Sequence, residues 1–198
     1  ETSSKNPKIP DNIQVGDFVV ARFESSSWAD YLPWEDWHHA GIISQLKPLK
    51  VIDVSGILLQ KKDKKSDKEE VREGVVEYEM GKKRTIILLD GTKNPNGNLW
   101  LLDDLLETAW LRPVFPNPIR EIDTWYKPWI LRKIITEKEA RERAIYYARK
   151  QLDEPYNIIA SKWNESKWYC SLLIYKSYSR TVTGMYLETY GAGPMVTP

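Results

Sequence analysis

Residues 38–56 read HHAGIISQLKPLKVIDVSG and carry the clearest strand pattern of the chain. Aliphatic residues, several of them β-branched, fill His39–Ser44 and Val51–Val54, as is typical of strands. The connection between the two segments is short and contains Pro48. The stretch therefore predicts a β-hairpin.

Further strands are expected on both sides of this hairpin. Asp17–Phe23 (DFVVARF) precedes it and Val75–Tyr78 follows it. Thr85–Leu89 is expected to pair with Val75–Tyr78 through a turn at Gly81. Strands that follow one another in this way usually lie side by side in an antiparallel sheet.

The middle of the chain predicts a helix and an irregular connection. NLWLLDDLLETAW, residues 98–110, has leucines at helical spacing and Asn98 as a plausible N-cap. Four prolines between residues 113 and 128 indicate an irregular connector. Trp129–Ile134 then predicts one more strand.

Two helices are expected near the C-terminal end. The first begins at a capping box formed by Thr136 and Glu139. Its apolar stripe consists of Ala140, Ala144, Tyr147 and Ala148. The second begins near Cys170 and runs toward Gly184. Strands come first and helices last, so the pattern predicts an α+β fold with an antiparallel sheet packed against C-terminal helices.

The composition is that of an ordinary globular protein. The 198 residues fit one domain, residues 13–198, preceded by a polar, proline-containing arm over residues 1–12. The formal net charge of +1 gives no overall attraction to nucleic acid or to an anionic membrane. The charged run KKDKKSDKEEVRE, residues 61–73, predicts an exposed loop. No apolar run is long enough for a transmembrane segment.

Few side chains of this chain can carry out nucleophilic chemistry. Cys170 is the single cysteine, so no intrachain disulfide can form. The two histidines are His38 and His39. Cys170 lies where a polar segment gives way to a helical apolar pattern, and free N–H groups at a helix start stabilise a thiolate. The alternative is a small buried cysteine without chemistry.

A nucleophilic thiol needs a base, and the base needs a group that orients it. Asp53 lies among apolar residues of a predicted strand, and a buried carboxylate needs a partner. His39 on the adjacent strand could supply it. With one cysteine and two adjacent histidines, a metal site is not expected, and no cofactor is expected either.

Alternation along the strand separates the two histidines. His39 shares a face with Gly41 and Ile43, while His38 shares the other face with Ala40 and Ile42. Gly41 carries no side chain, so we expect the helix with the nucleophile to approach the His39 face. His39 is therefore predicted to be the base, and His38 to have a substrate or packing role.

Several segments, in order, resemble a known family. GDFVVARF, HHAGII, VIDVSG and EGVVEY are followed by ARERAIYYARKQLDEPYN and WYCSLLIYKSY. This order is similar to the permuted NlpC/P60 (papain-like) cysteine hydrolases of the YaeF/YiiX group. The resemblance covers roughly residues 15–80 and 129–180, and residues 90–128 are expected to be an insertion into the catalytic domain.

The resemblance implies a role for each matching residue. Cys170 would be the nucleophile, His39 the base, and Asp53 the group that orients His39. Asp53 stands where relatives often carry Glu, which makes Glu77 the first alternative. Candidates for binding substrate or the oxyanion are Tyr156, Ser171 and Trp37.

The resemblance implies hydrolysis of an amide in a peptide, an N-acyl amide or a cell-wall fragment. One alternative is a thiol acyltransferase or lipid deacylase, for which tryptophans would line an apolar site. Another is a non-catalytic binding module on the same fold. No basic stripe with interleaved aromatics is present, so nucleic acid is not expected as a partner. The chain begins at Glu1 without Met, which is consistent with a trimmed, extracytoplasmic protein.

Overall fold

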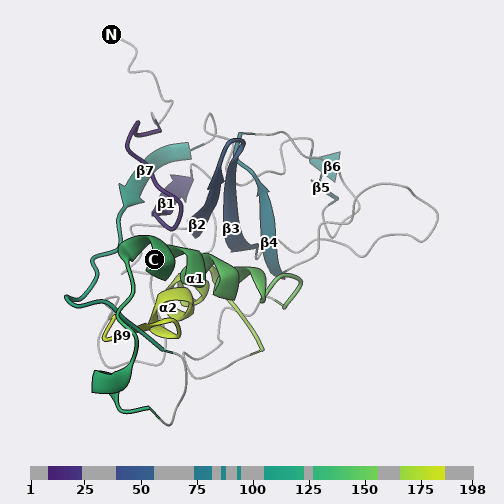
Figure 1. Ribbon diagram of the computed structural model, residues 1–198. Coiled ribbons are helices and arrows are strands. Elements are labelled where there is room, and N and C mark those ends of the chain that lie inside the picture. The colour runs from purple at the N-terminus through teal and green to yellow at the C-terminus, as the bar shows by residue number, and fades with distance from the viewer. Residues whose placement is uncertain are drawn as a thin grey trace, which may run out of the picture.

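An antiparallel sheet forms the centre of the computed structural model (Figure 1). The structure describes residues 9–23, 39–55, 74–81, 86–87, 93–94, 105–122, 127–155 and 166–185. The sheet has five strands in the order β4-β3-β2-β1-β7. Their bounds are β1 Phe18–Phe23, β2 His39–Leu46, β3 Leu49–Ser55, β4 Gly74–Glu79 and β7 Leu105–Leu111.

The predicted hairpin is confirmed. β2 and β3 are antiparallel, and Lys47 and Pro48 connect them. The register places Gly41 opposite Asp53, and on the other side of β2 it places His39 opposite Ala21 of β1. His39, Gly41 and Asp53 therefore share one face of the sheet.

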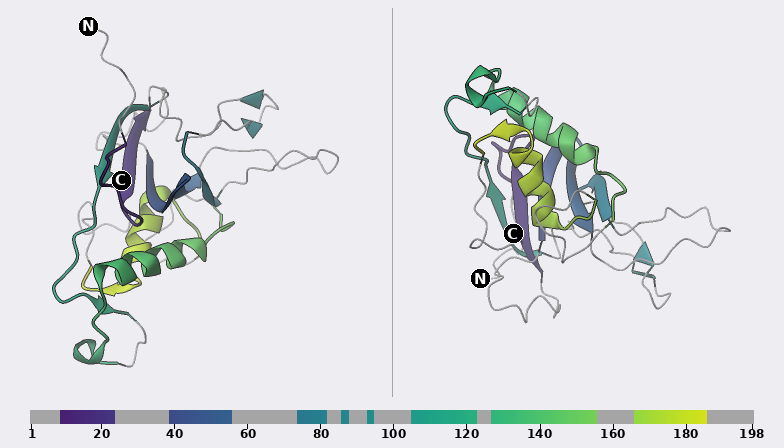
Figure 2. Two further views of the ribbon diagram at one scale, coloured as in Figure 1. Left: turned by 45° about the horizontal axis from the view of Figure 1, so that its top comes forward. Right: turned by 90° about the horizontal axis from the view of Figure 1, so that it is seen from below.

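Two helices pack on the opposite face of the sheet (Figure 2). Helix α1, Glu137–Arg149, begins with the expected capping box of Thr136 and Glu139. Helix α2, Cys170–Ser179, packs against α1, β2 and β3. The core between sheet and helices includes Ala40, Ile42, Ile52, Ala144, Leu172 and Leu173. These residues have the alternation on the strands and the helical spacing that a two-layer core requires.

A second apolar cluster lies on the His39 face. It consists of Val19, Ala21, Ile43, Val51, Tyr78 and Met80. Both faces of the central strands are thus buried, which explains why apolar residues occur on both faces of β2 and β3.

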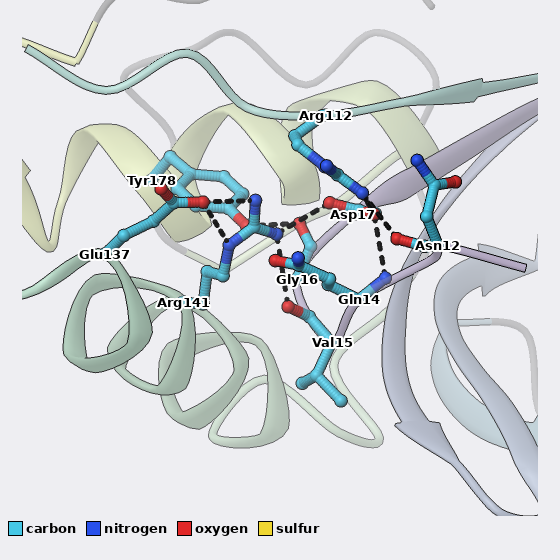
Figure 3. Close-up of polar contacts among 9 residues, drawn as sticks. All are labelled: Asn12, Gln14, Val15, Gly16, Asp17, Arg112, Glu137, Arg141 and Tyr178. Carbon is cyan, nitrogen blue, oxygen red and sulfur yellow. Dashed lines mark hydrogen bonds and ion pairs between the residues drawn. The ribbon is translucent and has the colours of Figure 1, made fainter.

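An ion-pair network joins the start of β1 to α1 (Figure 3). Arg141 donates to Asp17 at 2.6 Å and to Glu137 at 2.8 Å. Tyr178 of α2 donates to the carbonyl of Gly16. Gly16 has a φ of +87°, and an added Cβ would lie 2.8 Å from the Tyr178 hydroxyl. A glycine is therefore required at this position.

Three expectations about secondary structure are wrong. The helix predicted over residues 98–110 is replaced at its C-terminal end by β7, which pairs with β1. Leucine spacing alone cannot distinguish a helix from an apolar strand, and β1 would otherwise have an unpaired edge. Part of the expected insertion at 90–128 thus belongs to the main sheet.

The other two errors concern short elements. Trp129–Ile134 is not a strand, because Trp129–Leu131 forms a 3₁₀ helix, η3. Thr85–Leu89 does not pair with β4, because β5 (Ile86–Ile87) pairs with β6 (Lys93–Asn94) instead. A second small sheet pairs β8 (Arg120–Glu121) with β9 (Val182–Thr183).

Candidate active site

His39 and Asp53 form a buried, hydrogen-bonded pair. The distance from His39 Nε2 to Asp53 Oδ2 is 2.7 Å. His39 is 7% exposed and Asp53 is fully buried. His39 on β2 and Asp53 on β3 are diagonal neighbours. The residue directly opposite Asp53 on β2 is Gly41. A glycine there leaves the direct path between the two side chains open.

Cys170 is the second interaction partner of His39. It is the first residue of α2, as the sequence predicted, and its side chain is partly exposed. The Cys170 side chain is hydrogen-bonded to His39. Since Nε2 binds Asp53, the Nδ1 atom is the ring nitrogen that remains for the sulfur.

These contacts determine the protonation of His39. Burial by itself lowers the pKa of His39, but the charge and hydrogen bond of Asp53 raise it, as do those of Cys170. The net effect raises the pKa from 6.5 to about 10. At neutral pH the ring is therefore an imidazolium, a cation beside the carboxylate of Asp53.

Tyr78 is a site residue that the sequence reasoning missed. Its hydroxyl donates to Asp53 Oδ2 at 2.5 Å, the same oxygen that binds His39. Tyr78 is on β4, two residues after Val76, which is opposite Asp53. Strand alternation could have placed it on the Asp53 face, but only the register of β4 shows that the two side chains meet.

Glu77, the alternative to Asp53, has another partner. Its carboxylate binds Arg149 of α1 at 2.8 Å. It neighbours Tyr78 in β4 and therefore points to the opposite, helix-facing side of the sheet. Burial raises the pKa of Glu77, but hydrogen bonds from Arg149 and Ser44 outweigh this and lower it. Of the two carboxylates, Asp53 is the one that the structure brings to His39.

The expectation that the helix with Cys170 approaches the sheet over Gly41, on the His39 face, is wrong. The helices cover the face of Ala40 and Ile42, not the Gly41 face. His39 meets Cys170 because each is the first residue of its element. The start of β2 and the start of α2 therefore come together without close packing of the helix on Gly41.

Comparison with known families places the chain in one of them. A family model described as "permuted papain-like amidase enzyme, YaeF/YiiX, C92 family" matches residues 12–192. The chain belongs to this family of permuted papain-like amidases. No curated protein and no solved structure matches the chain.

As a permuted papain-like amidase, the chain has the α+β fold and the enzyme class that the resemblance implied. In this amidase no helix of the described ranges is long and apolar enough to cross a membrane. Within the same ranges no cluster of three or more potential metal-binding side chains occurs.

Of the remaining predicted site residues of the amidase, the structure describes one, Ser171. Ser171 follows Cys170 in the first turn of α2, and it is only 5% exposed. A direct contact between its side chain and substrate would therefore need local opening. Tyr156, Trp37 and His38 lie outside the described residues.

Proposed function

We propose that this amidase hydrolyses its substrate through an acyl-enzyme on Cys170, with His39 as general acid and base and Asp53 as the group that orients His39. The observation that carries the proposal is the position of the His39 ring, which is bound at Nε2 by Asp53 and hydrogen-bonded to Cys170. This is the arrangement that nucleophilic thiol catalysis requires.

In the first half-reaction the Cys170 thiolate attacks the carbonyl carbon of the scissile amide and forms a C–S bond. The negative charge passes to the carbonyl oxygen. Backbone N–H groups in the first turn of α2 lack partners within the helix ladder and can stabilise this oxyanion. The His39 imidazolium then donates its proton to the amide nitrogen as the C–N bond breaks.

In the second half-reaction His39 is neutral and acts as a base. It accepts a proton from water, whose oxygen attacks the thioester carbon. The C–S bond breaks, the carboxylic acid product leaves, and the thiolate–imidazolium pair is restored. Asp53 holds the ring in one orientation and stabilises its positive form throughout.

Tyr78 has a positioning role in this proposal. Its hydroxyl donates to the Asp53 carboxylate. This bond restricts Asp53 to the rotamer that faces His39. The residue acts through Asp53 and touches neither Cys170 nor substrate in this scheme.

The substrate class proposed is a peptide-type amide: a small peptide, an N-acyl amide or a peptide of the bacterial cell wall. Hydrolysis of cell-wall peptides would be an activity in common with the NlpC/P60 thiol peptidases. The partly exposed sulfur of Cys170 allows access by such substrates.

Selective alkylation and turnover test the proposal with three variants. Cys170→Ala is expected to abolish hydrolysis of a peptide-amide library, a loss of at least ~10⁴-fold. His39→Ala should cause a similar loss and slow iodoacetamide alkylation of Cys170 at neutral pH, because the thiolate loses its cation. His38→Ala is the matched control and should retain most of both rates.

Folding of each variant is checked by circular dichroism. The assignment of the base would be wrong if His38→Ala abolished activity while His39→Ala preserved it. Full turnover by Cys170→Ala would remove the thiol from the mechanism altogether. Adding hydroxylamine or an alcohol as acceptor distinguishes hydrolysis from acyl transfer by the product that forms.

A further inference from the structure

An apolar turn projects from the body of the protein beside the N-terminal end of α1. The Trp129 turn, defined here as residues 127–134, contains η3 and is seen as the short dark-green helix in Figures 1 and 2. Its large apolar side chains are Trp129 at 61% exposed, Ile130 at 61%, Leu131 at 69% and Ile134 at 57%. Four such side chains in eight consecutive residues form an exposed apolar patch, which marks an interaction surface.

The charges of this turn have one sign. Its sequence, KPWILRKI, contains Lys127, Arg132 and Lys133 and no carboxylate. Lys133 pairs with Glu139 of α1, whose carboxylate lies 3.3 Å from the Lys133 amine in an exposed pair. Exposed pairs of this kind are weak and leave the lysine able to exchange partners.

The apolar side chains are held outward by a defined backbone. Arg120 of β8 donates to the carbonyls of Ile130 and Arg132 at 3.2 and 3.0 Å. Its guanidinium also lies 5.5 Å from the centre of the Trp129 ring. Arg132 donates to Thr183 of β9 at 2.8 Å. The turn is thus anchored to the β8–β9 sheet and cannot collapse onto the core without losing these bonds.

We propose that the Trp129 turn docks on the surface of an anionic lipid bilayer. Tryptophan and aliphatic side chains favour the boundary between headgroups and acyl chains, and flanking cations favour anionic headgroups. The turn combines both groups of residues in one short segment. A protein partner would bury the same apolar side chains, but the absence of carboxylates in the turn favours a uniformly anionic surface.

This docking would hold the candidate active site apart from the lipid contact. The turn is tied to β9, which follows the C-terminal end of α2, whereas Cys170 is at its N-terminal end. The ten residues of α2 separate the two ends by ~15 Å. The Trp129 turn and Cys170 are therefore separate sites, and their variants can be tested independently.

Vesicle co-sedimentation with the full chain tests the proposal. The probes are vesicles of phosphatidylcholine alone and of phosphatidylcholine with phosphatidylglycerol. The patch variant is Ile130→Ser with Leu131→Ser, and the charge variant is Lys127→Gln with Lys133→Gln. Tyr146→Ser is the matched control, since Tyr146 is 62% exposed on α1, outside the turn.

Wild type and Tyr146→Ser are expected to bind the anionic vesicles alike. The patch variant should bind at least about tenfold more weakly, and the charge variant about fivefold more weakly for each cation removed. Iodoacetamide labelling of Cys170 should be the same in all variants, which shows that the site is intact. Sedimentation velocity without lipid should show one oligomeric state throughout.

Three results would overturn the proposal. The first is no binding of wild type to anionic vesicles. The second is binding that the patch variant retains in full. The third is a patch variant that changes the oligomeric state without lipid, because a second copy of the chain would then be the occupant.

Discussion

Asp17 and Asp53 are both buried aspartates with a cationic partner, and they differ in what that partner can do. Asp17 accepts a hydrogen bond from Arg141 at 2.6 Å, and Asp53 binds His39 at 2.7 Å. Both carboxylates are at most 5% exposed. The Asp17 pair joins positions 124 residues apart, whereas the Asp53 pair lies within the β2–β3 hairpin.

The difference lies in the cation. The guanidinium of Arg141 remains charged at every accessible pH, and it spreads its donors over Asp17, Glu137 and the Val15 carbonyl. The imidazole of His39 titrates, and its second nitrogen is left for Cys170. A buried pair with a permanent cation clamps elements together, whereas a pair with a titratable cation can also exchange a proton with a nucleophile.

The largest effect on stability should follow from breaking the Asp17 pair. Arg141→Met leaves Asp17 buried without its main partner, and we expect the free energy of unfolding to fall by about 3–5 kcal/mol. Urea denaturation measures this change. Lys138→Met is the control, because the Lys138 side chain is 85% exposed and should change stability little. Alkylation of Cys170 in the folded fraction should not change, and a slower rate would show that the two regions are coupled.

Neutralising Asp53 tests the other pair through its chemistry. In Asp53→Asn the charge that raises the pKa of His39 is lost, while the burial that lowers it remains. His39 is then neutral at pH 7, and its orientation is less defined. We expect kcat/KM to fall by about 10²–10³-fold and the pH profile of Cys170 alkylation to move to higher pH. Glu77→Gln is the control, and an equal loss there would mean that Asp53 is not the orienting residue.

The two pairs should also respond differently to pH. The pKa of His39 is raised from 6.5 to about 10 on folding. Its protonation therefore stabilises the folded state fully below about pH 6.5, and this contribution is lost as the pH rises toward about 10. Wild type should lose stability over this range relative to His39→Gln. Urea unfolding at several pH values measures the difference, and parallel curves for the two proteins would contradict it.

The smallest effect is expected for Tyr78→Phe. The variant removes one hydrogen bond to the Asp53 carboxylate, and we expect kcat/KM to fall by about tenfold. The loss should appear in kcat with KM unchanged, because in the proposed mechanism Tyr78 positions Asp53 and does not touch substrate. A purely structural role would lower stability without lowering kcat of the folded protein. Tyr146→Phe, on the surface of α1, provides the control.

Much of the fold could be predicted from local sequence. The hairpin around Pro48, the capping box at Thr136 and the start of α2 at Cys170 are all confirmed. Each depends on residues close together in the chain. The strand β7 was predicted as helix because its leucines fit both periods, and only the unpaired edge of β1 decides between the two.

For the candidate site, the composition limits which residues are available. One cysteine, two adjacent histidines and an aspartate on an apolar strand leave few ways to build a thiol nucleophile with a base. Which of them meet depends on how the strands and helices pack. The tertiary structure brought Tyr78 to Asp53, paired Glu77 with Arg149, and joined Cys170 to His39 at the starts of α2 and β2. The physical reason is that strand alternation is a local property, whereas register and helix packing depend on contacts between segments far apart in the chain.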